Sequence, residues 1–189
     1  MIMRDTYELW THQKPELKDL ILNQGRITVK RKYIKDKYGE QADIFLTAYN
    51  FFVQKFREYV SCPGGAEYPF WAATDREAAS AGTEGVFLRL EVPADQTVFF
   101  SASQWNQILN LEYLADSPED KKHFNKKLDS MGLNPEAKSE ILITPHYPLL
   151  KAEIKKSWHD NFKLARNPER IEDNHVKAAL WELKSNWLI

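Results

Sequence analysis

The chain has 189 residues, 43% of them hydrophobic and 28% charged, which is enough to bury the core of one globular domain. Its 26 Lys and Arg residues nearly cancel its 27 Asp and Glu residues, which excludes a global attraction to nucleic acid or anionic membranes. Cys62 is the sole cysteine, and no segment approaches the roughly 18 apolar residues of a membrane span. We expect one cytoplasmic domain over residues 1–189, without a membrane segment.

The first quarter of the chain predicts a strand followed by a helix. Tyr7 to Thr11 has the composition of a short strand. Pro15 to Gln24 predicts a helix, because Pro15 stands in its first turn and Gly25 follows its last residue. The pattern of Arg26 to Tyr38 assigns no secondary structure.

The middle of the chain predicts a core helix and several strands. Apolar residues at helical spacing predict a helix over Ala42 to Val60. Tyr68 to Ala73 reads as an aromatic strand, and Thr74 with Glu77 has the form of a capping box that opens a brief helix. Two further strands are expected over Val86 to Val92 and Gln96 to Phe100, the second as hairpin partner of the first.

The C-terminal half is predicted to be mostly helical. Capping signals at Ser101 and Ser117 open two helices, and steps of four apolar residues predict a third over Pro148 to Phe162. The tail from His175 to Ile189 fits the period of either a strand or a helix. The fold class expected from these elements is α+β, with a small, mostly antiparallel sheet packed by several helices.

The sequence offers little for metal or hydrolytic chemistry. Its five histidines are scattered and a thiolate site needs more than one cysteine, so no metal site is predicted. There is no nucleophile elbow and no glycine-rich phosphate loop. A basic run could bind an acidic partner or RNA, although a solvated surface is the simpler interpretation; its residues are Arg26, Lys30, Arg31, Lys32, Lys35 and Lys37.

One ordered set of motifs resembles the core of the ADP-ribosyltransferase fold. A strand leads through His12-Gln13 into a helix closed by Gly25, and the aromatic strand at Tyr68 to Ala73 runs into a Thr-capped helix before a strand ending in Pro93. The resemblance implies NAD as cofactor. Departure of nicotinamide develops positive charge on the ribose, which an aromatic wall and a nearby carboxylate stabilise.

The same resemblance implies the site residues. The carboxylate would be Glu182 and a second catalytic residue His12, while Thr11 and Gln13 would hold the ribose side of NAD. Tyr68 or Trp71 would wall the nicotinamide, with Thr74 beside it; each of these residues also has an ordinary structural interpretation as core, cap or exposed strand residue. The acceptor would be a protein or nucleic acid, and the role that of a toxin or phage-conflict effector.

A second resemblance covers most of the chain and concerns a family of small bacterial and phage-type domains of unknown function. Its members open with Leu-Trp-Thr-x-Gln, as Leu9 to Gln13 does here, and the motifs Tyr-Pro-Phe-Trp-Ala, Leu-Glu-Val-Pro and Ala-Leu-Trp-Glu-Leu follow in the same order. This resemblance favours a strand through about Leu183. Lys177 stands where the family is expected to have Gln. The alternative function is a non-catalytic protein that binds a protein or RNA partner through its basic and aromatic surface.

Overall fold

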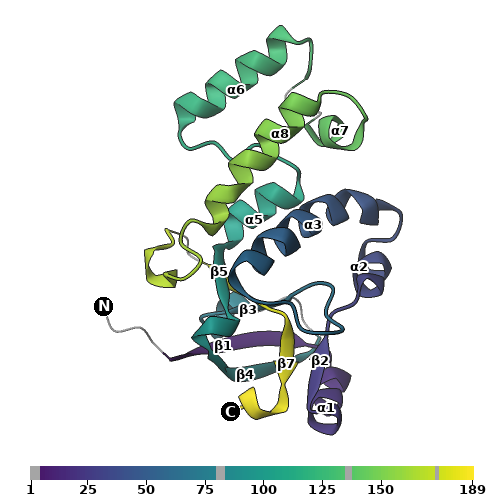
Figure 1. The fold of residues 1–189 in the computed structure, drawn as a ribbon, viewed down its shortest axis with the longest axis vertical. Coiled ribbons are helices and arrows are strands. Elements are labelled where there is room, and N and C mark those ends of the chain that lie inside the picture. The colour runs from purple at the N-terminus through teal and green to yellow at the C-terminus, as the bar shows by residue number, and fades with distance from the viewer. Residues whose placement is uncertain (1–4, 80–83, 135–137, 173–174) are drawn as a thin grey trace.

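The fold, seen in a computed structural model that describes residues 5–79, 84–134, 138–172 and 175–189, is built on two antiparallel sheets (Figure 1). The larger sheet has the strand order β4 (Val86–Pro93), β1 (Thr6–Gln13), β3 (Phe70–Ala73), β6 (Val176–Leu180) and β5 (Val98–Ser101). The smaller sheet pairs β2 (Arg26–Thr28) with β7 (Glu182–Lys184). The predicted α+β class and mostly antiparallel sheet are confirmed.

Eight α-helices accompany the sheets within the described residues. They are α1 (Pro15–Gln24), α2 (Arg31–Tyr38), α3 (Ala42–Tyr59), α4 (Arg76–Ala79), α5 (Ala102–Leu109), α6 (Pro118–Ser130), α7 (Lys138–Ile143) and α8 (Pro148–Ser157). Figure 1 shows α3 next to the larger sheet, and α6, α7 and α8 at the far end of the molecule. Short 3-10 turns follow several of these elements, including Trp158–Phe162 after α8 and Ser185–Trp187 after β7.

The two faces of the larger sheet are buried by different partners, because successive strand residues point to opposite sides. On one face Leu9, Leu90 and Leu180 share a core with Ile21 of α1 and Trp187. On the other face, strand residues such as Phe100 and Ala179 pack with α3, α5 and Trp158. The core therefore lies on both sides of the sheet, which explains why β3, β5 and β6 are buried along most of their length.

Local signals in the sequence place most helix ends correctly. Gly25 adopts the left-handed conformation at φ 76° and its N–H donates to the Ile21 carbonyl, which closes α1 where predicted. Ser101 and Ser117 accept hydrogen bonds from the backbone N–H groups of Gln104 and Asp120, both at 3.1 Å, so the predicted caps of α5 and α6 are confirmed.

Three sequence expectations were wrong in detail. Val98–Ser101 is not the hairpin partner of β4: β4 pairs with β1, whereas β5 pairs with β6 at the opposite edge of the sheet. The cap of α4 is Asp75, whose Oδ1 accepts from the Ala78 N–H at 2.7 Å, in place of Thr74. The helix expected over Pro148 to Phe162 ends at Ser157 and continues as a 3-10 turn.

Candidate functional site

The polar end of β1 is joined to β3. The hydroxyl of Thr11, which is 1% exposed, donates to the Trp71 carbonyl at 2.8 Å, and the Gln13 amide donates to the same hydroxyl at 2.7 Å. Three of the predicted site residues are thus brought together by hydrogen bonds. Thr11 both donates and accepts, so its hydroxyl is satisfied inside the protein.

His12 lies on the other face of β1 from Thr11 and is packed against its neighbours. Its ring centroid is 4.7 Å from that of Phe87, the residue opposite it on β4. Gly85 lies against the imidazole and has φ 140°, and a Cβ at this position would come within 2.7 Å of the ring. The imidazole ring is therefore packed between Phe87 and Gly85, and a glycine is needed at position 85 because any Cβ there would collide with the ring.

Trp71 belongs to an aromatic cluster beneath α3 and α5. Its ring centroid lies 4.8 Å from Phe52, 5.1 Å from Phe100 and 5.4 Å from Trp105. The ring of Tyr49 lies 6.0 Å from that of Trp71, and the pKa of Tyr49 is raised chiefly by burial and further by neighbouring Tyr38. The ring remains partly exposed, so an edge of the cluster reaches the surface.

Tyr68 and Thr74 stand at the two ends of the β3 segment in contrasting environments. Tyr68 is 5% exposed and its hydroxyl donates to the Asn50 side chain at 2.8 Å. Thr74 is exposed in the bend before α4. Beside that bend, Lys177 donates to the Ala78 carbonyl, and burial lowers the pKa of this lysine against the opposing charge of Asp75.

Glu182 lies where the two sheets separate. Strand β6 pairs with β3 as far as Leu180, opposite Phe70, but two residues later Glu182 pairs with Thr28 of β2. Val29, the residue after Thr28, forms an antiparallel bridge with Tyr68. Tyr68 and Glu182 therefore contact consecutive residues of the β2 segment, at the fork between the sheets.

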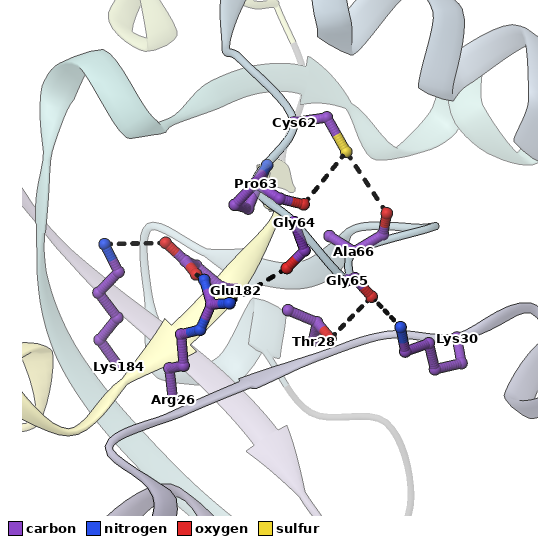
Figure 2. Close-up of polar contacts among 10 residues, drawn as sticks. All are labelled: Arg26, Thr28, Lys30, Cys62, Pro63, Gly64, Gly65, Ala66, Glu182 and Lys184. Carbon is purple, nitrogen blue, oxygen red and sulfur yellow. Dashed lines mark hydrogen bonds and ion pairs between the residues drawn. The ribbon is translucent and has the colours of Figure 1, made fainter.

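The Glu182 carboxylate is neutralised by two cations (Figure 2). Its Oε2 accepts from Arg26 Nη1 at 2.9 Å and its Oε1 pairs with Lys184 Nζ at 2.8 Å. The side chain of Glu182 is 6% exposed, whereas those of Arg26 and Lys184 are 50% and 34% exposed. The buried carboxylate thus lies beneath two cations that reach solvent, an arrangement that offsets the cost of burying its charge.

Arg26 and two neighbours on the same extended segment also hold a glycine loop. Alternate residues of an extended segment share one side, so Arg26, Thr28 and Lys30 all face the loop. Arg26 donates to the Gly64 carbonyl at 3.1 Å, Thr28 donates to the Gly65 carbonyl at 3.1 Å, and Lys30 also donates to Gly65 (Figure 2). We call this set the Glu182 cluster; it comprises Arg26, Thr28, Lys30, Gly64, Gly65, Glu182 and Lys184.

Sequence reasoning found Glu182 but missed its partners. No functional role was predicted for the Pro63-Gly64-Gly65 turn, and Arg26 and Lys30 were considered only as part of the basic run. A signal was present in the alternation Arg26-x-Thr28-x-Lys30, which is typical of a strand with one polar face. Gly65, at φ 89°, allows the turn that aims its carbonyl at β2.

The comparisons with known proteins place the chain in a family. A model of a domain of unknown function, DUF3841, matches residues 8–189. The chain belongs to this family. Membership in a family of unknown function, predicted from the Leu9 to Gln13 motif and those after it, is therefore confirmed. No curated protein and no solved structure matches the chain.

Two further features, a cluster of metal ligands and a membrane-spanning helix, are absent from the described residues. Among the described residues, no group of three or more His, Cys, Asp or Glu side chains is arranged to hold a metal ion. No helix in the described part is long and apolar enough to cross a membrane.

One hollow in the described part of the chain lies away from the predicted site residues. It has a volume of about 760 Å³ and is lined by the start of α5 and the turn after α8, including Ser101, Asp116, Asp160 and Lys163. The neighbouring Asp160 carboxyl raises the pKa of Asp116, and Lys163 pairs with Asp160 at 2.8 Å. None of the residues predicted to bind NAD lines this hollow.

Proposed function

We propose that this DUF3841 protein is an ADP-ribosyltransferase that uses NAD to modify a protein or nucleic acid. The observation that carries the proposal is the fork between the sheets, where Tyr68 and Glu182 pair with consecutive residues of the β2 segment and the Glu182 carboxylate is buried. Support also comes from the order of motifs along the chain and from the link between Thr11, Gln13 and Trp71.

The charges around Glu182 suit a substrate that carries a diphosphate. Two cations face one carboxylate, so the pair of Arg26 and Lys184 has one positive charge in excess, and both are partly exposed. A diphosphate presents acceptor oxygens that guanidinium and ammonium groups bind well. We propose that Arg26 and Lys184 bind these oxygens and thereby free Glu182 to face the ribose.

NAD supplies the ADP-ribosyl group, whose glycosidic carbon gains positive charge as nicotinamide leaves. A carboxylate placed beside that carbon stabilises the charge, and in this proposal Glu182 has that role. Thr11 and Gln13 hold the ribose hydroxyls, and Tyr68, with the exposed edge of Trp71, contacts the nicotinamide. His12, fixed by Phe87 and Gly85, and the exposed Thr74 complete the proposed site.

The proposal is tested by thermal unfolding with and without millimolar NAD, using ADP-ribose as a companion ligand. A ligand at a hundred times its dissociation constant adds about 2.7 kcal/mol, which raises the midpoint of a chain this size by roughly 5–10 °C. Release of nicotinamide is then followed for the wild type and Glu182→Gln. We expect the variant to lose the activity at least a hundredfold while keeping a cooperative unfolding transition.

A matched control removes a carboxylate from another Arg–Glu ion pair between two strands, that of Arg89 and Glu8. Glu8 accepts from Arg89 at 2.6 Å on the larger sheet, so Glu8→Gln deletes a similar contact away from the fork. We expect this variant to keep the NAD shift and the activity. A flat NAD response in the wild type, or equal activity in Glu182→Gln and Glu8→Gln, would refute the proposal.

The cellular setting we propose is the cytoplasm, where a single cysteine stays reduced. Modification of a macromolecule there would suit a toxin or phage-conflict effector, an inference by analogy with other ADP-ribosyltransferases. Induced expression in bacteria tests it. We expect growth arrest with the wild type and normal growth with Glu182→Gln, and equal growth of the two strains would contradict this role.

A further inference from the structure

The positive charge of the chain is concentrated in one short segment. Residues 26–37 contain six of the 26 Lys and Arg residues and one of the 27 Asp and Glu residues. The segment therefore has a formal net charge of +5, while the rest of the chain has −6. A charge separation of this size creates a local field although the whole protein is nearly neutral.

The fold displays this segment on the surface. Helix α2 buries Ile34 and partly buries Tyr38, and its remaining side chains are exposed. Within residues 5–79, 84–134, 138–172 and 175–189, none of the four α2 cations Arg31, Lys32, Lys35 and Lys37 forms an ion pair with a carboxylate. Their charges are thus available to a partner. Figure 1 shows α2 at the outer side of the molecule, beyond β2 and beside α3.

Helical spacing arranges the exposed side chains of α2 in two groups. Arg31, Lys32 and Lys35 are neighbours on one flank, because residues three and four apart lie side by side. Tyr33 and Lys37 are four apart on the other flank, and Tyr33 is 59% exposed. An exposed aromatic ring on the same helix as several cations is a combination that binds single-stranded nucleic acid: the cations contact phosphates and the ring stacks on a base.

We propose that α2 is the docking surface for a single-stranded nucleic acid. Phosphates bind Arg31, Lys32 and Lys35, and a base stacks on Tyr33 beside Lys37. An acidic protein would be attracted by the same cations, but it would gain little from the exposed phenol ring. The surface does not depend on NAD binding; if the transferase proposal also holds, the docked strand is the acceptor of the ADP-ribosyl group.

The test measures binding of a fluorescein-labelled oligothymidylate of about 20 nucleotides by anisotropy, over a range of salt concentrations. The variant Lys32→Gln/Lys35→Gln/Lys37→Gln removes three exposed cations from α2. The matched control Lys121→Gln/Lys122→Gln/Lys126→Gln removes three exposed cations from α6. Both sets are exposed, so we expect unchanged thermal midpoints.

We expect the α2 variant to bind at least tenfold more weakly than the α6 control. The slope of log affinity against log salt should fall in magnitude by about 1.4, since Lys32 and Lys35 are two of the proposed phosphate contacts and each such contact on a single strand contributes roughly 0.7. Tyr33→Ala should weaken binding about fivefold or more, whereas Tyr33→Phe, which keeps the ring, should bind as the wild type.

Three results would overturn the proposal. The first is equal binding by the α2 variant and the α6 control. The second is an unaffected Tyr33→Ala, which removes the stacking contact. The third is displacement of the strand by polyglutamate at equal charge concentration, which would assign the surface to an acidic protein. Because the assay contains no NAD, its failure leaves the thermal shift with NAD untouched, and the two proposals fail separately.

Discussion

The aromatic cluster beneath α3 and the Glu182 cluster hold neighbouring parts of the same sheets by different forces. Phe52 is fully buried and its ring centroid lies within 5.1 Å of four other rings, those of Trp71, Phe100, Trp105 and Phe162. The Glu182 cluster instead joins a buried carboxylate to partly exposed cations and to the carbonyls of a glycine loop.

Trp71 and Glu182, which were predicted to share one site, therefore have surroundings of different kinds. Close ring packing depends on shape and on exclusion of water, so the rings around Trp71 contribute mainly to stability. Contacts between charges depend on the partners available, and a bound anion can replace a carboxylate on Arg26 or Lys184. Of the two regions, the Glu182 cluster is the one whose contacts a ligand can exchange.

The largest effect is expected from truncation in the aromatic cluster. Phe52→Ala removes a fully buried ring and leaves a cavity among the other aromatic residues, so the free energy of unfolding should fall by about 3–5 kcal/mol. Denaturant titration measures this loss. Tyr33→Ala on exposed α2 is the control and should change the free energy by less than about 0.5 kcal/mol. Similar losses in both variants would contradict the assignment of Phe52 to the core.

An intermediate effect is expected at the Glu182 cluster. Glu182→Gln removes a buried charge from between Arg26 and Lys184, which remain partly hydrated, so the loss should be roughly 1–3 kcal/mol. A double-mutant cycle with Arg26→Gln isolates the pair, and we expect a coupling of at least about 0.5 kcal/mol. Additive losses within error would show that the two side chains do not interact.

The smallest effect at neutral pH, and a specific pH signature, is expected at Tyr49. Burial raises the pKa of Tyr49, so the folded protein keeps this proton where the unfolded chain loses it. Stability is therefore complete below pH 10 and declines as the pH rises above 10, by about 1 kcal/mol per unit. Tyr49→Phe should lose this component of the decline. If the free energy of unfolding depended on pH above 10 in the same way in the wild type and in Tyr49→Phe, this assignment would be contradicted.

Much of the architecture follows from local sequence. The strand at Tyr7 to Thr11, the helix from Pro15 to Gln24 and the caps at Ser101 and Ser117 were all predicted, because proline, glycine and serine act through their own backbone or the next turn. The tail, whose period was ambiguous, is a strand through Leu180 and again from Glu182.

The candidate site was predictable only in part. Hydrogen bonds join Thr11, Gln13 and Trp71, three residues that were predicted for one site. The predicted carboxylate, Glu182, is buried. Its binding to Arg26, which lies 156 residues away in the chain, has no counterpart in local spacing. The roles of these residues toward NAD stay predictions.

The sequence by itself determined many of the helices and strands, several of their ends, and the family to which the motifs belong, but it left β2, α2 and the C-terminal tail unassigned. Only the tertiary structure decided that β5 pairs with β6, that β7 leaves the large sheet for β2, and that a glycine loop meets Arg26 and Glu182. Pairing between distant strands depends on which buried faces and hydrogen-bonding edges fit together in space, and residue spacing along one segment does not contain that information.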